Sequence, residues 1–407
     1  MIDDVSAIRE RSDAVYEAGA ALRAVTADDR AAWLAASAEL LLQRASAQSA
    51  ALAQSTGLSA PMVSWAVQTT LRTIEEDALR ALGTRAAGSG AAPIAMLSVI
   101  LAGNVFTGSV RGLVVPLLLG VPVLVKSSSQ ETMFPGMLRD ALRHLDRRLG
   151  AALDVVSFER GDLEQEAALV ASAEAVAVYG SDQTVASIGA RCGEKRLIPH
   201  GHGISAAYCG RDALTEARIG DTISGLSLDI CAYDQRGCLS PQVVFVEATA
   251  DCPALAFAER LATEGLEPIS GTLPRGPLPL PVGAAQAQWR GTAEVEGTLV
   301  QGETYAICVH TAGPIRWSPG YRNVTVIPVE DLAHAFQAME PFAASLKCLG
   351  TDSASRRQVE SKLAKSRTLQ AYACNLGHMQ TPPLDAPADG KPVWYGLLRP
   401  QTPMKRR

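Results

Sequence analysis

The sequence predicts an α/β protein with two doubly wound domains that follow a helical N-terminal segment. Three observations support this prediction. The chain has 407 residues, enough for two or three domains with large cores. Its hydrophobic content of 47% and charged content of 19% are typical of globular proteins. From about residue 96 onward, short apolar runs alternate with amphipathic segments of helical length, as in βαβ units with a parallel sheet.

The first eighty or so residues are rich in Ala, Leu, Glu and Arg at helical spacing, and we expect roughly three helices there. Thr26, with Asp28 and Asp29 after it, is typical of a helix N-cap. Ser59 followed by Pro61 indicates a second helix start. A stretch rich in glycine at 88–93 ends this helical segment.

Two α/β blocks follow. The first runs to residue 208, with strands expected at 96–101, 121–125, 153–158, 175–179 and 204–208 and helices at 107–119, 133–149, 163–172 and 183–190. The second runs over 209–375, with strands expected at 243–246, 298–300, 305–309 and 324–327 and helices at 254–263 and 332–339. The proline-rich stretch 266–282 is interpreted as a surface excursion, and the tail 376–407 is expected to pack back on the first block.

Composition excludes several classes of protein. The net charge of -5 gives no reason to expect a nucleic-acid partner, and the short basic tail 405–407 is interpreted as a solvated end. Eight cysteines without a CxxC pair argue against a disulfide framework and against a metal site. No signal peptide and no membrane span are apparent, so we expect a cytoplasmic protein with reduced thiols.

Cys238 is the first candidate functional residue. It lies on a glycine-containing turn directly before the apolar run 243–246. A thiol ahead of a buried strand can be held rigidly while its sulfur faces a cleft, whereas a structural cysteine more often lies within an apolar run. We therefore interpret Cys238 as a nucleophile and Cys231, Cys252 and Cys308 as buried small residues.

Polar side chains follow two of the expected strands. Asn104 lies where a strand opens into a helix, and its amide can either donate to an oxyanion or cap that helix. Lys126 ends the next strand and is followed by three serines. Such a cluster suits a ribose hydroxyl or a phosphate, although a solvated strand end has the same composition.

A glycine-rich match to a dinucleotide-binding fingerprint occurs at Gly201, Gly203 and Ala206. A true fingerprint follows a strand and opens a helix, whereas this match leads into the strand-like run 204–208. If a nicotinamide cofactor binds, we therefore expect another binding mode.

The segments that carry these candidate residues, and their order along the chain, resemble the aldehyde dehydrogenase superfamily. The resemblance is closest to the fatty acyl-CoA reductase family of the bacterial bioluminescence type. The segment 101–106 is similar to the superfamily's Asn-bearing oxyanion segment, and 120–129 to its strand that ends in a cofactor-binding Lys. The segment 178–181 resembles the Gly-Ser turn against the cofactor, and 234–246 resembles the nucleophilic cysteine segment. Four motifs in the right order are more specific than any one of them.

The resemblance implies an aldehyde dehydrogenase-like fold, in which residues 1–208 hold the cofactor domain and 209–375 the catalytic domain. The catalytic residues that it implies are Cys238 and Asn104. The cofactor-binding residues that it implies are Lys126, Ser128, Ser129, Gly180 and Ser181.

The departures from the family pattern affect the predicted chemistry. Aldehyde-oxidising members activate water with a Glu in a Glu-Leu-Gly-Gly segment, but the corresponding stretch here holds His200 and His202 and no carboxylate. Their second Glu, which grips the nicotinamide ribose, has no counterpart near 317–321. An acyl-enzyme without a base for water should survive long enough to be reduced. The two histidines are either acid/base or phosphate-binding groups, or ordinary polar residues of a loop.

The resemblance thus implies an oxidoreductase that reduces an acyl thioester to an aldehyde, with acyl-CoA or an acyl carrier protein as donor. NADPH is favoured over NADH because Ser129 stands where NAD-preferring relatives often carry a Glu, although Glu131 lies close by. The alternatives are an acyl-phosphate reductase, a CoA-acylating aldehyde dehydrogenase, and a non-catalytic scaffold in an acyl-processing complex. The segment 85–93 is short where relatives carry an oligomerisation hairpin, so a small oligomer such as a homodimer is expected.

Overall fold

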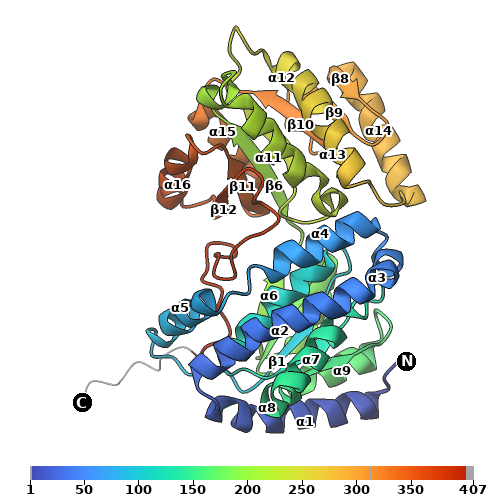
Figure 1. Cartoon of the computed structure of the whole chain (residues 1–407), viewed down its shortest axis with the longest axis vertical. Helices are drawn as coiled ribbons and strands as arrows, with labels where there is room; N and C mark the ends of the chain where they lie inside the picture. Colours follow the sequence, from blue (N-terminus) through green and yellow to red (C-terminus); the bar gives the residue numbers. More distant parts are fainter. Residues whose placement is uncertain (1, 311–312, 400–407) are drawn as a thin grey trace.

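Two parallel sheets form the framework of the protein in a computed structural model that describes residues 2–310 and 313–399 (Figure 1). The first sheet has the strand order β3-β2-β1-β4-β5, and its strands are all parallel. The second has the order β12-β11-β6-β7-β10-β9-β8, and there β8 runs antiparallel to β9. The predicted α/β class with two doubly wound domains is confirmed.

The N-terminal segment forms five helices rather than the roughly three expected from periodicity. They are α1 (Val5–Ala24), α2 (Ala27–Ala47), α3 (Ser49–Thr56), α4 (Ala60–Leu71) and α5 (Glu76–Ala87). The additional boundaries are short: Gln48 separates α2 from α3, and left-handed Gly57 ends α3. The predicted caps are confirmed, since Thr26 accepts from the Asp29 N–H and Ser59 from the Met62 N–H.

The first sheet contains one strand, β5, that was not predicted from the sequence. Its strands are β1 (Leu97–Ile100), β2 (Val123–Lys126), β3 (Leu153–Val156), β4 (Ala175–Tyr179) and β5 (Arg196–His200). Its helices are α6 (Ser109–Leu118), preceded by a 3₁₀ turn (Phe106–Gly108), α7 (Phe134–Leu145), α8 (Arg147–Ala151), α9 (Leu163–Ala171) and α10 (Asp182–Cys192). Strand β5 was not predicted because it is a partly exposed edge strand that includes Arg196 and Pro199.

The second sheet begins earlier than predicted. Strand β6 (Ile204–Cys209), assigned from the sequence to the first block, pairs with β7 (Pro241–Val246) and with β11 (Leu346–Thr351). The chain therefore crosses between the sheets at 201–203, and the expected boundary at residue 208 is wrong. An apolar run shows that a strand is buried but carries no information about which sheet it joins.

The remaining strands of this sheet are β8 (Gly297–Gln301), β9 (Ala306–His310), β10 (Asn323–Pro328) and β12 (Tyr372–Asn375). Its helices include α11 (Ile219–Cys231), α12 (Ala254–Arg260), α13 (Glu267–Thr272), α14 (Leu280–Glu296), α15 (Leu332–Met339) and α16 (Arg356–Lys365). The stretch 266–282 is thus partly helical, contrary to expectation. Pro268 and Pro281 lie in the first turns of α13 and α14, where a missing N–H costs nothing.

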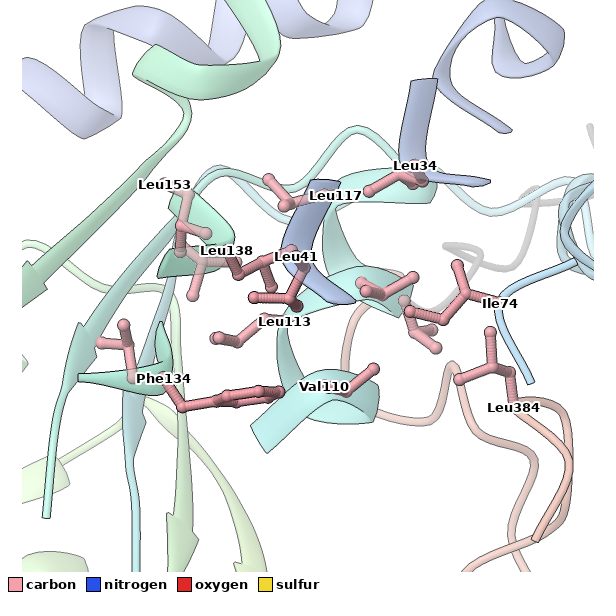
Figure 2. Close-up of a cluster of buried hydrophobic side chains, with 14 of the residues drawn as sticks. Leu34, Leu41, Ile74, Val110, Leu113, Leu117, Phe134, Leu138, Leu153 and Leu384 are labelled. Carbon is pink, nitrogen blue, oxygen red and sulfur yellow. The ribbon is translucent and has the colours of Figure 1, made fainter. Parts of the chain in front are cut away.

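The helical layer, the first sheet and the C-terminal segment share one core (Figure 2). Leu34 and Leu41 of α2 pack with Leu113 of α6, and Leu384 reaches the same cluster from beyond the second sheet. Burying each such side chain stabilises the fold by about 1.5–3 kcal/mol. The chain up to residue 399 therefore runs back along the first domain, whereas 400–407, with the basic tail, lies outside the described residues. No helix in the described ranges is long and apolar enough to cross a bilayer.

Candidate active site

The carboxyl edge of the first sheet gathers most of the residues that the sequence singled out. Asn104 follows β1, Lys126 ends β2, Gly180 follows β4 and His200 ends β5. The strand order reverses between β1 and β4, and open α/β sheets bind ligands at such a switch point. These four residues lie at the same edge of the sheet because its strands are all parallel.

Lys126 presents a cation at this edge. The side chain is buried, and its ammonium lies 5.2 Å from the centre of the Phe158 ring. Burial lowers the pKa of Lys126, an effect that Glu166 opposes and Arg160 reinforces. The Lys126 ammonium makes no hydrogen bond or ion pair with the described residues, so its N–H donors are available to an anion or a hydroxyl.

The loop after β1 lies against the loop after β2. A Cβ at Gly103 would overlap the hydroxyl of Ser128 and come within 2.7 Å of Gln130 Oε1, so only glycine allows this approach. Ser128 is buried, whereas Ser129 is exposed. Glu131 accepts hydrogen bonds from the Met133 N–H at 2.6 Å and the Phe134 N–H at 2.7 Å. Its carboxylate thus caps α7, and the hydroxyl of Ser129 is left to face solvent.

The Gly-Ser turn after β4 is held at both residues. Ser181 caps α10 by accepting from the Thr184 N–H at 3.2 Å. The Gly180 N–H donates to the carbonyl oxygen of His200 at 3.1 Å. The turn is therefore fixed to the neighbouring strand and presents its backbone at the carboxyl edge.

Cys238 lies at the amino edge of the second sheet. Of the eight cysteines, all within the described part of the chain, Cys238 alone is exposed. The Ser205 hydroxyl donates to the Cys238 carbonyl at 2.7 Å and accepts from the Cys348 N–H at 3.1 Å. A Cβ at Gly203 would lie 3.0 Å from the Cys238 Cβ and would overlap the Lys347 side chain. Strands β6 and β11 therefore fix the position of this cysteine.

The turn that leads to Cys238 is strained. Tyr233, Asp234 and Gln235 have φ angles of 53°, 52° and 58°, in the left-handed region that costs about 1–2 kcal/mol per residue. Asp234 and Arg322, both fully buried, form an ion pair of 2.8 Å. The Gln235 amide donates to the Asn323 carbonyl at 2.8 Å. The surrounding contacts hold the backbone in this unfavourable conformation, as is common at functional sites.

The same turn packs against the first domain. The Tyr233 hydroxyl lies 2.5 Å from the Thr107 hydroxyl. The Asn104 side-chain amide donates to the Arg236 carbonyl at 2.9 Å, two residues before Cys238. An amide nitrogen carries two hydrogens, so the second remains free to donate to another acceptor. Asn104 therefore lies against the turn that leads to Cys238, although the two residues are 134 positions apart in the sequence.

The electrostatic environment of the thiol is mixed. Cys238 is reached by solvent, yet protein atoms crowd its sulfur, and this burial raises the pKa of the thiol. Lys347 and Arg111 lower the pKa of Cys238, whereas Asp389 raises it. Lys347 donates to Asp389 at 2.6 Å, and Arg111 donates to the Ala386 carbonyl. The resting thiol is therefore protonated at neutral pH, and a base must take its proton before it can attack.

Sequence reasoning missed these charged residues. Arg236, the cation nearest to Cys238 in the sequence, instead donates its guanidinium N–H groups to the Tyr233 and Thr56 carbonyls. Lys347 comes from strand β11 of the second sheet, and Arg111 comes from helix α6 of the first domain. No local pattern marks either one, because only the tertiary fold brings them to the cysteine.

The two candidate histidines have separate environments. His200 stacks on the Tyr179 ring, with 4.2 Å between ring centres. Burial lowers the pKa of His200 to about 4, with Asp389 opposing this shift and Arg111 adding to it. His200 is therefore neutral at physiological pH. His202 is exposed, and its backbone N–H donates to Asp182 at 2.8 Å.

The lowered pKa of His200 predicts an acid-sensitive contribution to stability. We expect the His200 ring to titrate near pH 4 in the folded protein, measured by NMR. The unfolded chain takes up this proton first, at the ordinary histidine pKa of about 6.5, so stability falls as pH drops from about 6.5 to 4. His200→Gln should flatten this fall in urea denaturation, whereas the exposed His144→Gln should not. A His200 ring that titrates near pH 6.5 would contradict the buried environment.

Solved structures define the class to which this fold belongs. The chain is similar to aldehyde dehydrogenase 21 from Physcomitrella patens (14% identity, TM-score 0.74, 98% of this chain and 90% of that one). It is similar to methylmalonate-semialdehyde dehydrogenase from Oceanimonas doudoroffii (14% identity, TM-score 0.74, 98% of this chain and 90% of that one). A benzaldehyde dehydrogenase from Corynebacterium glutamicum also shares the fold (13% identity, TM-score 0.70, 93% of this chain and 87% of that one). The fold is therefore that of the aldehyde dehydrogenase superfamily.

A family model identifies the chain more narrowly. The model for acyl-CoA reductase (LuxC) matches residues 36–391, a span that includes both sheets and the cysteine segment. The chain therefore belongs to the LuxC acyl-CoA reductase family and is an oxidoreductase that acts on an acyl or aldehyde group. Comparison with curated proteins gave no significant match.

Proposed function

We propose that this protein reduces an acyl thioester to an aldehyde with NADPH, through an acyl group carried on Cys238. The observation that carries the proposal is the hydrogen bond that the Asn104 amide donates across the two domains to the Arg236 carbonyl, two residues before the exposed Cys238. His200 ends β5 in the segment where water-activating relatives carry a Glu. Asp389 does lie near the thiol, but its carboxylate is engaged by Lys347. The acyl-enzyme is thereby protected from hydrolysis.

The residues at the carboxyl edge of the first sheet fit a nicotinamide dinucleotide. Lys126 is a buried ammonium without a described hydrogen-bond partner, and the exposed Ser129 hydroxyl lies three residues beyond it. We assign Lys126, Ser128 and Ser129 to the ribose and its 2′-phosphate, and the turn Gly180-Ser181 to the face of the cofactor. Bound NADPH supplies the hydride that reduces the acyl group.

Attack by Cys238 requires a base and an oxyanion site. We assign the base to the neutral imidazole of His200. The same three charged residues, Arg111, Lys347 and Asp389, act electrostatically on His200 and on Cys238. The Cys238 sulfur forms a bond to the thioester carbonyl carbon, and the carrier thiol leaves with the proton. The second amide hydrogen of Asn104 and the Cys238 N–H stabilise the oxyanion. Once the acyl group is reduced, the Cys238 sulfur leaves and the aldehyde is released.

Intact-protein mass spectrometry tests the proposal directly. Incubation with a panel of acyl-CoAs in the absence of cofactor should give a single stable acyl adduct on Cys238, and the preferred chain length should acylate fastest. The adduct should disappear when NADPH is added, with aldehyde formed in equal amount. A protein that takes up no acyl group from any thioester would support the scaffold alternative, and adducts from acyl phosphates alone would favour an acyl-phosphate reductase.

Asn104→Ala is expected to slow acylation of Cys238 by about 10²–10³-fold, because loss of one oxyanion donor has this effect in acyl transfer. The measurement is the single-turnover rate of adduct formation. Asn104→Asp is the matched control: it keeps the size but replaces the amide donor with a charge, so it should be at least as slow. If Asn104→Ala acylates at the wild-type rate, the amide serves only to hold the Arg236 carbonyl.

Ser129→Glu is expected to lower kcat/KM for NADPH by about 10-fold or more while sparing NADH, because a carboxylate repels the 2′-phosphate. The measurement compares kcat/KM with each cofactor. Ser127→Ala is the control, since that buried hydroxyl already donates to the Val156 carbonyl. An unchanged NADPH preference would show that Ser129 does not contact the ribose.

A further inference from the structure

Helix α16 and the loop after it carry the densest run of basic residues in the part of the chain that the structure describes. Residues 356–367 hold five basic side chains and one acidic one, a net charge of +4 in a chain whose net charge is -5. Arg356 is paired with the acidic residue, Glu360, at 2.7 Å. Arg357, Lys365 and Arg367 are exposed and have no ion-pair partner among the described residues.

These cations line an open groove rather than a closed pocket. The groove, of about 430 Å³, lies between α16 and the start of α15 and is lined by Leu332, Arg357, Gln358, Ser361, Lys362 and Lys365. From Arg357 to Lys365 the helix rises by about 12 Å, which is longer than a single phosphate group requires. Figure 1 shows α16 on the outer side of the second domain, beside the C-terminal segment.

The groove is connected to the candidate active site by a short series of contacts. The loop that follows α16 carries Gln370, and a Cβ at Gly390 would overlap its side chain. Asp389, the preceding residue, binds Lys347, whose side chain lies against Gly203 next to Cys238. Strands β12 and β7 are three positions apart in the sheet, a separation of about 14 Å. Helix α16 leads into the start of β12, and Cys238 precedes the start of β7, so the C-terminal end of the basic helix and the thiol lie toward the same edge of the sheet.

We propose that α16 is the docking surface for an acidic acyl carrier protein, which presents its thioester to Cys238 on a phosphopantetheine arm. This inference rests on the proposed function and names the donor of the acyl group. An exposed basic stripe of helical length matches an acidic helix of a protein partner, and opposite potentials steer such an encounter. The basic stripe binds the protein, while the arm reaches past Lys347 to the thiol.

The test separates docking from chemistry. Binding of a carrier protein that bears the arm without an acyl group is measured by calorimetry for the wild type and for Arg357→Glu/Lys365→Glu. The variant should bind about 10-fold or more weakly, and salt should weaken wild-type binding much more than residual binding by the variant. The control Arg9→Glu/Arg147→Glu makes the same charge change on exposed residues of α1 and α8, at the far end of Figure 1, and should bind normally.

The rate at which Cys238 is acylated provides the second measurement of the test. The variant should accept an acyl group from acyl-CoA at the wild-type rate and from the acyl carrier protein at least about 10-fold more slowly. Equal slowing with both donors would assign the surface to the phosphates of coenzyme A and overturn the proposal, as would absent or unchanged carrier binding. If the carrier protein binds through α16 but no thioester acylates Cys238, the docking surface stands and the proposed function fails.

Discussion

Cys238→Ala is expected to abolish reduction of acyl thioesters, with a loss of about 10⁴-fold or more, because removal of a covalent nucleophile eliminates the intermediate itself. The measurement is single-turnover oxidation of NADPH in the presence of an acyl-CoA, together with the mass of the protein. The substitution removes only the sulfur atom from a side chain that solvent reaches, so the thermal stability of the variant should be close to that of the wild type.

Cys252→Ala is the matched control for this experiment. Cys252 is buried near the start of α12, within the second domain. Its removal should cost about 1 kcal/mol of stability and leave the acylation rate unchanged. Turnover that persists in Cys238→Ala would exclude an acyl-cysteine intermediate, whatever the reaction catalysed.

Arg322→Met is expected to destabilise the protein by about 3–5 kcal/mol, because it leaves Asp234 as a buried charge without its cation. Arg322 is fully buried and also donates to the Leu273 carbonyl at 2.7 Å, so a second acceptor loses its donor. The same change frees the left-handed turn before Cys238 to relax. Acylation by the folded fraction should therefore slow as well. Urea denaturation and single-turnover acylation measure the two effects.

Arg80→Met provides the comparison. Arg80 pairs with Glu76 one turn away on α5 and with Asp28 of α2, and ion pairs at the surface contribute little to stability. If Arg322→Met is no more damaging than Arg80→Met, the buried pair is not what holds the strained turn. A stable variant that acylates slowly would instead assign Arg322 a role in positioning alone.

Much of the secondary structure in both domains could be predicted from local patterns. Strand β4 and helix α15 have the predicted bounds, and the caps at Thr26 and Ser59 lie where their side chains indicated. These features depend on residues close together in the sequence. Strand β5 and the sheet to which β6 belongs could not be predicted, because pairing at an edge depends on residues far apart in the chain.

In the candidate site, too, local sequence patterns marked some features, whereas others could be seen only in the structure. Asn104, Lys126, Gly180 and Cys238 each follow or precede an apolar run, so the order of these motifs was enough to suggest the family. The alternative partner for the ribose, Glu131, could be set aside only when its carboxylate was seen to accept the N–H groups of α7. A carboxylate's position in the sequence does not reveal which donors it satisfies.

The sequence by itself determined that this chain has an aldehyde dehydrogenase-like fold with a cysteine before a buried strand, since periodicity and motif order are local properties. Only the tertiary structure decided what surrounds that cysteine. Arg111, Lys347 and Asp389 come from a helix of the first domain, a strand of the second and the C-terminal segment. Electrostatic interactions depend on distance in space rather than along the chain, and folding alone brings these three charges to one thiol.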